Sequence, residues 1–119
     1  FISREHVNQG VVARFEDLLN QYFLSDLAQS LGLPTVAYFA DQLHLSPNYF
    51  GDLIKRETGQ AVKELIQNKL IEVAKELVFD GEKTVNEIAY ELGFKYPQHF
   101  RRFFKQKVGV TPNKYRSVN

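Results

Sequence analysis

The chain has 119 residues, of which 44% are hydrophobic, and a net charge of only +1, with no cysteine and no methionine. This composition is typical of one small globular domain or two lobes, and a chain without cysteine forms neither disulfides nor thiolate metal sites. Because no apolar run approaches the roughly 18 residues of a transmembrane helix and no signal peptide is visible, we expect a cytoplasmic protein with no membrane partner.

Residues 7–30 are predicted to be helical, because their apolar residues recur at the i, i+3, i+4, i+7 spacing of one helix face. A break is expected near Ser25, and Gly32 and Pro34 should end the segment. An apolar face of this length is unfavourable in water, so the segment should pack on the rest of the chain or pair with a second copy. We therefore predict an N-terminal helical segment over residues 1–34.

A pair of short helices is predicted over residues 35–61. Thr35 is placed to cap the first helix and Ser46 the second, which Gly59 should end. His44 falls in the turn between them, where the backbone requires a residue that tolerates positive φ. This order predicts a first helix-turn-helix lobe over residues 35–61.

A long linker helix is predicted over residues 62–81, where a broad apolar stripe contains no glycine or proline before the final residue. The pair of short helices then recurs in residues 82–119. Thr84 and Glu87 have the spacing of a capping box, and Gly93 supplies the turn. Residues 82–119 are therefore predicted to form a second helix-turn-helix lobe.

The two lobes are related by an internal repeat of about fifty residues. The first copy contains Thr35, Val36, Ala40, Leu43, Phe50, Ile54, Lys55 and Gly59, and the second contains Thr84, Val85, Ala89, Leu92, Phe100, Phe104, Lys105 and Gly109. Two such units joined by one helix are suited to reading two neighbouring major grooves. The predicted fold is all-α: two helix-turn-helix lobes joined by a long linker helix and preceded by an N-terminal helix.

Basic side chains are concentrated at the C-terminal end of the chain. Residues 92–119 hold seven Lys or Arg residues and no Asp or Glu, whereas residues 35–91 hold six basic and ten acidic residues. Such a concentration in a folded, aromatic-rich segment indicates a polyanionic partner, which for this repeat is double-stranded DNA. A solvated basic face is the alternative.

The exposed N-terminal part of each second helix is where a major groove would be read. The residues predicted to contact bases are Asn48, Asp52, Gln98, Arg101 and Arg102. Glutamine matches the donor and acceptor of adenine, arginine matches guanine, and aspartate accepts from the cytosine amino group. The residues predicted to contact the DNA backbone are Lys55, Arg56, Tyr96, Lys105 and Lys107. Contacts with phosphates position the protein on the duplex but do not distinguish one base sequence from another.

Other classes of functional site find no support in the sequence. His6, His44 and His99 lie far apart, with no i, i+4 pair and no carboxylate at ligand spacing. There is no nucleophile–base arrangement and no glycine-rich phosphate loop. We therefore expect no metal, no cofactor and no enzymatic activity.

Several segments resemble the DNA-binding domain of the AraC (AraC/XylS) family of bacterial transcription regulators. The segments that carry the resemblance are residues 45–50 (LSPNYF), 55–59 (KRETG) and 74–77 (AKEL), and the closing stretch with Ile88-Ala89, Gly93-Phe94, Phe100, Phe104-Lys105, Gly109-Val110-Thr111-Pro112 and Tyr115-Arg116. The resemblance covers residues 35–117. It implies two recognition helices in successive major grooves on one face of the duplex, held apart by a rigid linker helix.

The resemblance also implies partners beyond DNA. They are RNA polymerase and an N-terminal effector or dimerisation domain, which fits a chain without an initiating methionine, as expected of a fragment. Leu70 stands where the family often has arginine, and Tyr96 and Gln98 stand where aspartate and serine are usual. Gly51 and Asp52 occupy groove-facing positions of the first recognition helix. A helical protein-interaction module without DNA binding is the alternative function.

Overall fold

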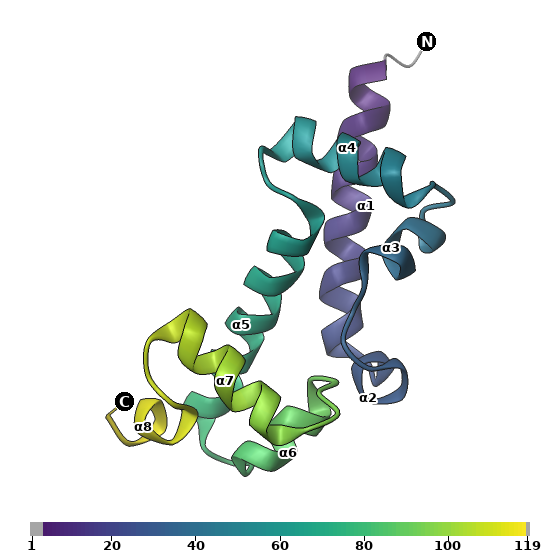
Figure 1. Cartoon of the computed structure of the whole chain (residues 1–119). Coiled ribbons are helices and arrows are strands. Elements are labelled where there is room, and N and C mark those ends of the chain that lie inside the picture. Colours follow the sequence, from purple (N-terminus) through teal and green to yellow (C-terminus); the bar gives the residue numbers. More distant parts are fainter. Residues whose placement is uncertain (1–3, 119) are drawn as a thin grey trace.

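The computed structural model describes residues 4–118, and every regular element in that range is an α-helix. In chain order the helices are α1 (Arg4–Leu24), α2 (Leu27–Leu31), α3 (Val36–Gln42), α4 (Pro47–Thr58), α5 (Val62–Asp80), α6 (Val85–Glu91), α7 (Pro97–Val108) and α8 (Pro112–Val118). Together they form an elongated body of 54 × 26 × 21 Å (Figure 1). The predicted all-α fold, with two helix-turn-helix lobes on a linker helix, is confirmed.

The helix limits follow the sequence signals closely. The predicted break near Ser25 separates α1 from α2, and α1 begins before residue 7, the predicted start. The predicted domain boundaries after residues 34, 61 and 81 fall between helices but remain predictions as domain limits. Residues 1–3 and 119 of the first and last predicted segments lie outside the described residues.

Side-chain caps fix where the short helices begin. The hydroxyls of Thr35 and Ser46 each accept a hydrogen bond from the backbone N–H three residues on, at 3.1 and 3.2 Å. Thr84 and Glu87 form the predicted reciprocal pair, with bonds of 3.1 and 3.0 Å. Each cap satisfies a backbone donor that the helix itself leaves free, and is typically worth about 1 kcal/mol.

The two turns have the same backbone geometry despite different residues. His44 and Gly93 both have positive φ, of 58° and 100°. In each turn, the N–H of the following residue donates to the carbonyl of Ala40 or Ala89 at 2.9 Å. The prediction that His44 replaces the turn glycine in the first lobe is therefore confirmed.

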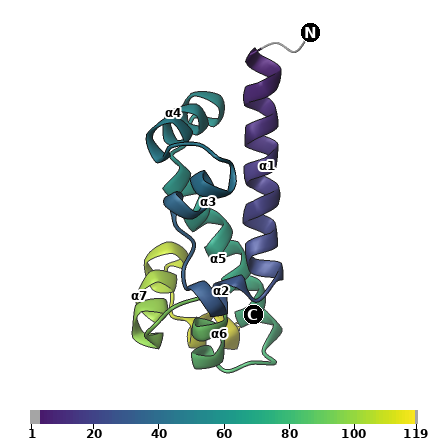
Figure 2. The same ribbon diagram turned by 90° about the vertical axis from the view of Figure 1, so that its right-hand side faces the viewer.

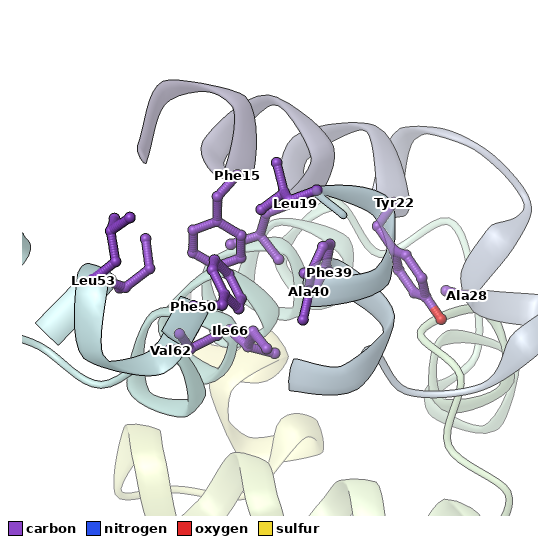
Figure 3. Packing of buried hydrophobic residues seen from close by; sticks show 12 residues of the cluster. Phe15, Leu19, Tyr22, Ala28, Phe39, Ala40, Phe50, Leu53, Val62 and Ile66 are labelled. Carbon is purple, nitrogen blue, oxygen red and sulfur yellow. The ribbon is translucent and has the colours of Figure 1, made fainter. Parts of the chain in front are cut away.

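The first lobe has an aromatic core to which α1 contributes directly. Phe15 of α1 contacts Phe39 of α3 and Phe50 of α4 edge to face, with ring centroids 5.2 Å apart in both pairs. Figure 3 shows Phe15 and Tyr22 directed from α1 into this cluster. Burying one phenylalanine side chain contributes about 1.5–3 kcal/mol. Of the two arrangements predicted for this helix, the structure shows packing within the same chain.

The second lobe is built from α6, α7, α8 and the end of α5. Phe100 and Phe104 of α7 are fully buried with Ile88 of α6, and Tyr115 of α8 contacts Phe104 with a centroid separation of 5.4 Å. Ala89 is also fully buried in this core, where a small side chain lets α6 and α7 pack closely.

Helix α5 joins the two cores. Its buried residues Val62 and Ile66 belong to the first cluster, and Leu70, Ala74 and Val78 belong to the second. Leu70 is 5% exposed, so this position packs rather than contacts solvent. A helix of nineteen residues is about 28 Å long and separates the lobes by a fixed distance.

The end of α5 is fastened by a residue that the sequence did not reveal as structural. Arg116 of α8 donates from Nε to the carbonyl of Val78 at 2.9 Å, and from Nη2 to the carbonyl of Lys83 at 2.7 Å. The first bond satisfies a carbonyl in the last turn of α5 that has no partner within the helix, and the second binds the loop that follows the helix. They also hold α8 against the linker.

The arrangement leaves one side of the molecule to α4 and α7. Figure 2 shows these two helices along the same edge, with α1 on the opposite side. None of the described helices combines the length and the apolar character needed to cross a membrane.

Candidate nucleic-acid interface

The first candidate reading face lies on α4. Asn48, Asp52 and Lys55 follow i, i+4, i+7 spacing, and all three are exposed. Phe50 and Ile54 are fully buried on the other side of the helix. Burial of this apolar side therefore fixes the outward direction of the three polar residues.

The second candidate reading face lies at the equivalent positions of α7. Gln98, Arg102 and Lys105 have the same spacing and are all exposed, while Phe100 and Phe104 are buried behind them. The two faces thus occupy equivalent positions on their helices, and α4 and α7 lie along the same edge of the molecule (Figure 2). The difference between them is chemical.

Arg101 is held differently from its neighbour Arg102. Its Nη2 atom donates to Oδ1 of Asn86, in the first turn of α6, at 2.5 Å. This bond directs the guanidinium from the reading face toward the start of α6. Arg102 forms no hydrogen bond or ion pair with any described residue, so its donors remain available for an outside partner.

The residues predicted to contact the DNA backbone are all exposed: Lys55, Arg56, Tyr96, Lys105 and Lys107. The Nζ atom of Lys55 donates to the carbonyl of Gly59 at 3.2 Å, which fits a cation at a helix C-terminus. Tyr96 is the N-cap of α7, and its ring contacts His99 edge to face with a centroid separation of 5.3 Å. The Tyr96 ring is thereby placed at the beginning of the reading helix.

The two reading helices differ in charge: the acidic and basic side chains of α4 cancel, whereas those of α7 are all basic. On α4, Asp52 and Glu57 offset Lys55 and Arg56, whereas α7 carries no acidic residue. The four basic residues of α7 are Arg101, Arg102, Lys105 and Lys107. Asn8 of α1 also donates to Glu57 at 3.2 Å, so α1 holds this acid in place. Of these two helices, α7 presents the strongly positive surface.

Sequence reasoning missed Asn86 and Arg116. Asn86 carried no signal beyond lying inside the capping box, and its approach to Arg101 depends on the angle between α6 and α7. Arg116 is part of the basic C-terminal end and of the family resemblance, but neither pattern predicts that its guanidinium donates to backbone carbonyls. The structure brings the predicted base-contacting residues onto two faces, with Arg101 turned aside.

Comparison with known proteins agrees with this geometry. A family described as a helix-turn-helix domain matches residues 39–117. The C-terminal domain of AraT, a response regulator from Geobacillus stearothermophilus, is 31% identical with a TM-score of 0.80, over 92% of this chain and 85% of that one. The DNA-binding domain of AdpA, solved in complex with a target DNA, shares the fold with a TM-score of 0.71 at 22% identity, over 93% of this chain and 90% of that one.

The chain spans only part of the length of a curated relative that it matches. The transcriptional regulatory protein YesN of Bacillus subtilis is 34% identical over 95 residues, which cover 76% of this chain but only 26% of YesN. The family match and these similarities place the chain among DNA-binding domains rather than enzymes. The chain belongs to the AraC (AraC/XylS) family of helix-turn-helix transcription regulators and is a DNA-binding domain of that family.

Proposed function

We propose that the chain recognises DNA by placing α4 and α7 in two successive major grooves on one face of a duplex. The observation that carries this proposal is that α4 and α7 lie along the same edge of the molecule (Figure 2), and that each has exposed polar residues opposite its buried side. The linker helix is about 28 Å long, comparable with the helical repeat of roughly 34 Å that separates successive grooves.

Base reading is assigned to residues whose side chains are exposed on these faces. We assign Gln98 to an adenine and Arg102 to a guanine, because their paired hydrogen-bonding groups match those base edges. Asn48 and Asp52 take the equivalent positions in the first groove. Without DNA, Arg101 is hydrogen-bonded to Asn86. It can contact a base only if this hydrogen bond is broken and replaced by one to DNA.

Backbone contacts are assigned to Lys55, Arg56, Tyr96, Lys105 and Lys107. Four of these are cations that neutralise phosphates, and the Tyr96 hydroxyl offers a neutral donor at the start of α7. Because the charge of α4 largely cancels, the second lobe should supply most of the affinity. The first lobe should add a weaker contact that refines the choice of sequence.

The test begins with a duplex selected from random sequences, and measures its dissociation constant over a series of salt concentrations. Affinity should fall steeply with salt, because each neutralised phosphate releases counterions. Asp52→Ala should raise affinity for unrelated duplexes about two- to fivefold at low salt, since it removes a repulsion from phosphate. Arg14→Ala is the matched control, because Arg14 is exposed on α1, and α1 lies on the opposite side of the molecule from α4 and α7 (Figure 2).

Two results would contradict the proposal. Affinity independent of salt would favour the alternative, a helical protein-interaction module, for which the exposed Asp52 and Glu57 of α4 are the supporting observation. A larger loss from Asp52→Ala than from Arg102→Ala would make the first lobe the principal reader and invert the proposed order.

The partners of the whole protein follow from the same reasoning. The matched region is about a quarter of YesN, so we propose that a sensor or dimerisation domain accompanies this domain in the intact protein. RNA polymerase is the proposed protein partner and the cytoplasm the proposed compartment, because regulation of transcription takes place there. Pull-down of polymerase on a promoter duplex tests the partner, with Arg102→Ala as the control for DNA-dependent recovery.

A further inference from the structure

The backbone of the second turn lies against the N-terminal segment with no room for a side chain. A Cβ atom added to Gly93 would lie 2.6 Å from the carbonyl carbon of Gly32, and 2.8 Å from both its oxygen and the nitrogen of Leu33. Such distances are far inside van der Waals contact, so only glycine fits at this position. Residues 25–33, which comprise α2 and its flanks, are called the brace below.

The brace is also bound by the first lobe, through Tyr22. Tyr22 of α1 is 1% exposed, and its hydroxyl donates to the carbonyl of Gly32 at 2.6 Å. Its ring contacts Tyr38 and Phe39 of α3, with centroid separations of 5.2 and 5.9 Å. One peptide unit, at Gly32, is therefore bound by the first lobe and touches the second.

The junction beside the brace is incompletely filled. A hollow of about 290 Å³ lies between the lobes, lined by Val36, Ile66, Leu70, Phe94 and Phe103. Close packing resists movement, so this unfilled part of the junction contributes little to holding the two lobes in one orientation. The contacts between α2 and α6 supply a second connection that α5 alone does not provide.

The position of Gly93 links this contact to DNA recognition. Gly93 occupies the turn that leads into α7, so a shift of the turn changes the direction of α7 relative to α4. Two helices that enter two grooves together must keep one spacing and one angle. A loose junction would still allow each lobe to bind alone but would weaken selection between spacings.

We propose that the brace fixes the spacing and angle of the two reading helices, and that Tyr22 and Gly93 are positioning residues for recognition of a paired site. This proposal rests on the proposed function, because spacing matters only if both helices bind DNA. Tyr22 acts through Gly32 and touches no DNA. Burial raises the pKa of Tyr22 above its ordinary value, so the hydroxyl keeps the proton that it donates.

The first test measures the lobes without DNA. The chain contains no cysteine, so spin labels can be attached at Asp41→Cys of α3 and Gln106→Cys of α7, both exposed positions. Tyr22→Phe removes the hydroxyl and keeps the ring, and should broaden the distance distribution between the labels. Tyr38→Phe is the matched control from the same aromatic cluster, and should leave the distribution unchanged.

The second test compares two duplexes. In one, the two half-sites have the spacing found in the duplex selected from random sequences, and in the other they are one base pair further apart. The preference for the selected spacing should fall about two- to tenfold in Tyr22→Phe, the effect expected from one lost hydrogen bond. Affinity for a single half-site should not change. A cross-link between Ser30→Cys and Tyr90→Cys, which line one groove between the brace and α6, should restore the preference.

The outcomes separate the two proposals. A distance distribution and a spacing preference both equal to those of the parent would overturn the brace. A broader distribution with unchanged preference would overturn the positioning role. If the parent itself bound no duplex, the proposed function would fail, and the distance measurement alone would still decide whether the brace holds the lobes.

Discussion

The two lobes share one backbone arrangement but differ in how their cores are built and in the charge of their reading helices. In the first, three edge-to-face phenylalanine rings join α1 to the helix pair, and the reading helix carries charges of both signs. In the second, the core is completed by short α8, and the reading helix carries only basic charges. The comparison teaches that repeated geometry does not imply equal roles. We propose that the first lobe mainly anchors the fold and that the second supplies most of the attraction to DNA.

The largest expected effect concerns the core of the first lobe. Phe15→Ala removes the ring that joins α3 and α4 to α1, and should cost about 3–5 kcal/mol of unfolding free energy in a urea titration. The matched control is Phe79→Ala, whose side chain is 59% exposed and should change stability by less than about 0.5 kcal/mol. Similar losses in both variants would show that Phe15 has no special part in joining α1 to the core of the first lobe.

The linker decides whether the two lobes behave as one unit. Glu72→Pro removes a backbone hydrogen bond in the middle of α5 and should cost about 3 kcal/mol or more. Binding to the paired site should fall further than binding to a half-site, because the spacing is disturbed. Glu72→Ala keeps the helix and serves as the control. Paired-site binding by the proline variant equal to that of the parent would show that the linker is not a rigid spacer.

A smaller effect should distinguish the two arginines of α7. Arg102→Ala should cost about 1–3 kcal/mol on the selected duplex and little on unrelated sequences, as expected of a base reader. Arg101→Ala should weaken binding to all sequences alike if its guanidinium moves from Asn86 to a phosphate. Competition binding with selected and unrelated duplexes measures the loss of affinity for each kind of duplex in both variants. Equal loss of specificity in the two variants would mean that Arg101 also reads a base.

The smallest effect is a pH dependence that belongs to the second lobe. Hydrogen bonds from the backbone and side chain of Thr84 lower the pKa of Glu87. The stability from this carboxylate is therefore present above the ordinary glutamate pKa, and is lost as pH falls through the lowered pKa of the folded state. When thermal midpoints are measured from neutral to acidic pH, the midpoint of Glu87→Gln should fall less than that of the parent.

The first lobe provides the control for that measurement. Thr35 caps α3 without a carboxylate partner, since Tyr38 stands where Glu87 stands in the second lobe. Thr35→Ala should lower the midpoint by a similar amount at every pH. An acid dependence altered by Thr35→Ala would show that the effect is not specific to the Thr84–Glu87 pair.

Local features of the fold could be predicted because their causes lie within a few residues. The caps at Thr35, Ser46 and Thr84 and the positive φ of His44 depend on side-chain chemistry and backbone sterics at short range. The outward direction of the reading residues follows from the apolar spacing that buries the opposite side of each helix. The roles of those residues in DNA contact remain predictions.

Features that depend on the approach of distant segments could not be predicted. The bond between Arg101 and Asn86 requires the crossing angle of two helices, and Arg116 reaches carbonyls 38 and 33 residues away in sequence. Gly32 was read only as a helix stop, yet it lies against the second turn. Composition and periodicity describe one helix at a time. They do not predict which residues of different helices come into contact.

The absence of space at Gly93 restricts how this domain can be recombined. A protein engineer who wished to change DNA specificity would naturally exchange residues 82–119 as a cassette. A donor lobe with any side chain in the turn would strike the backbone of residues 32 and 33, even if every residue of its reading helix were compatible. The transferable unit must therefore include the N-terminal segment, or the donor must itself carry glycine at the turn.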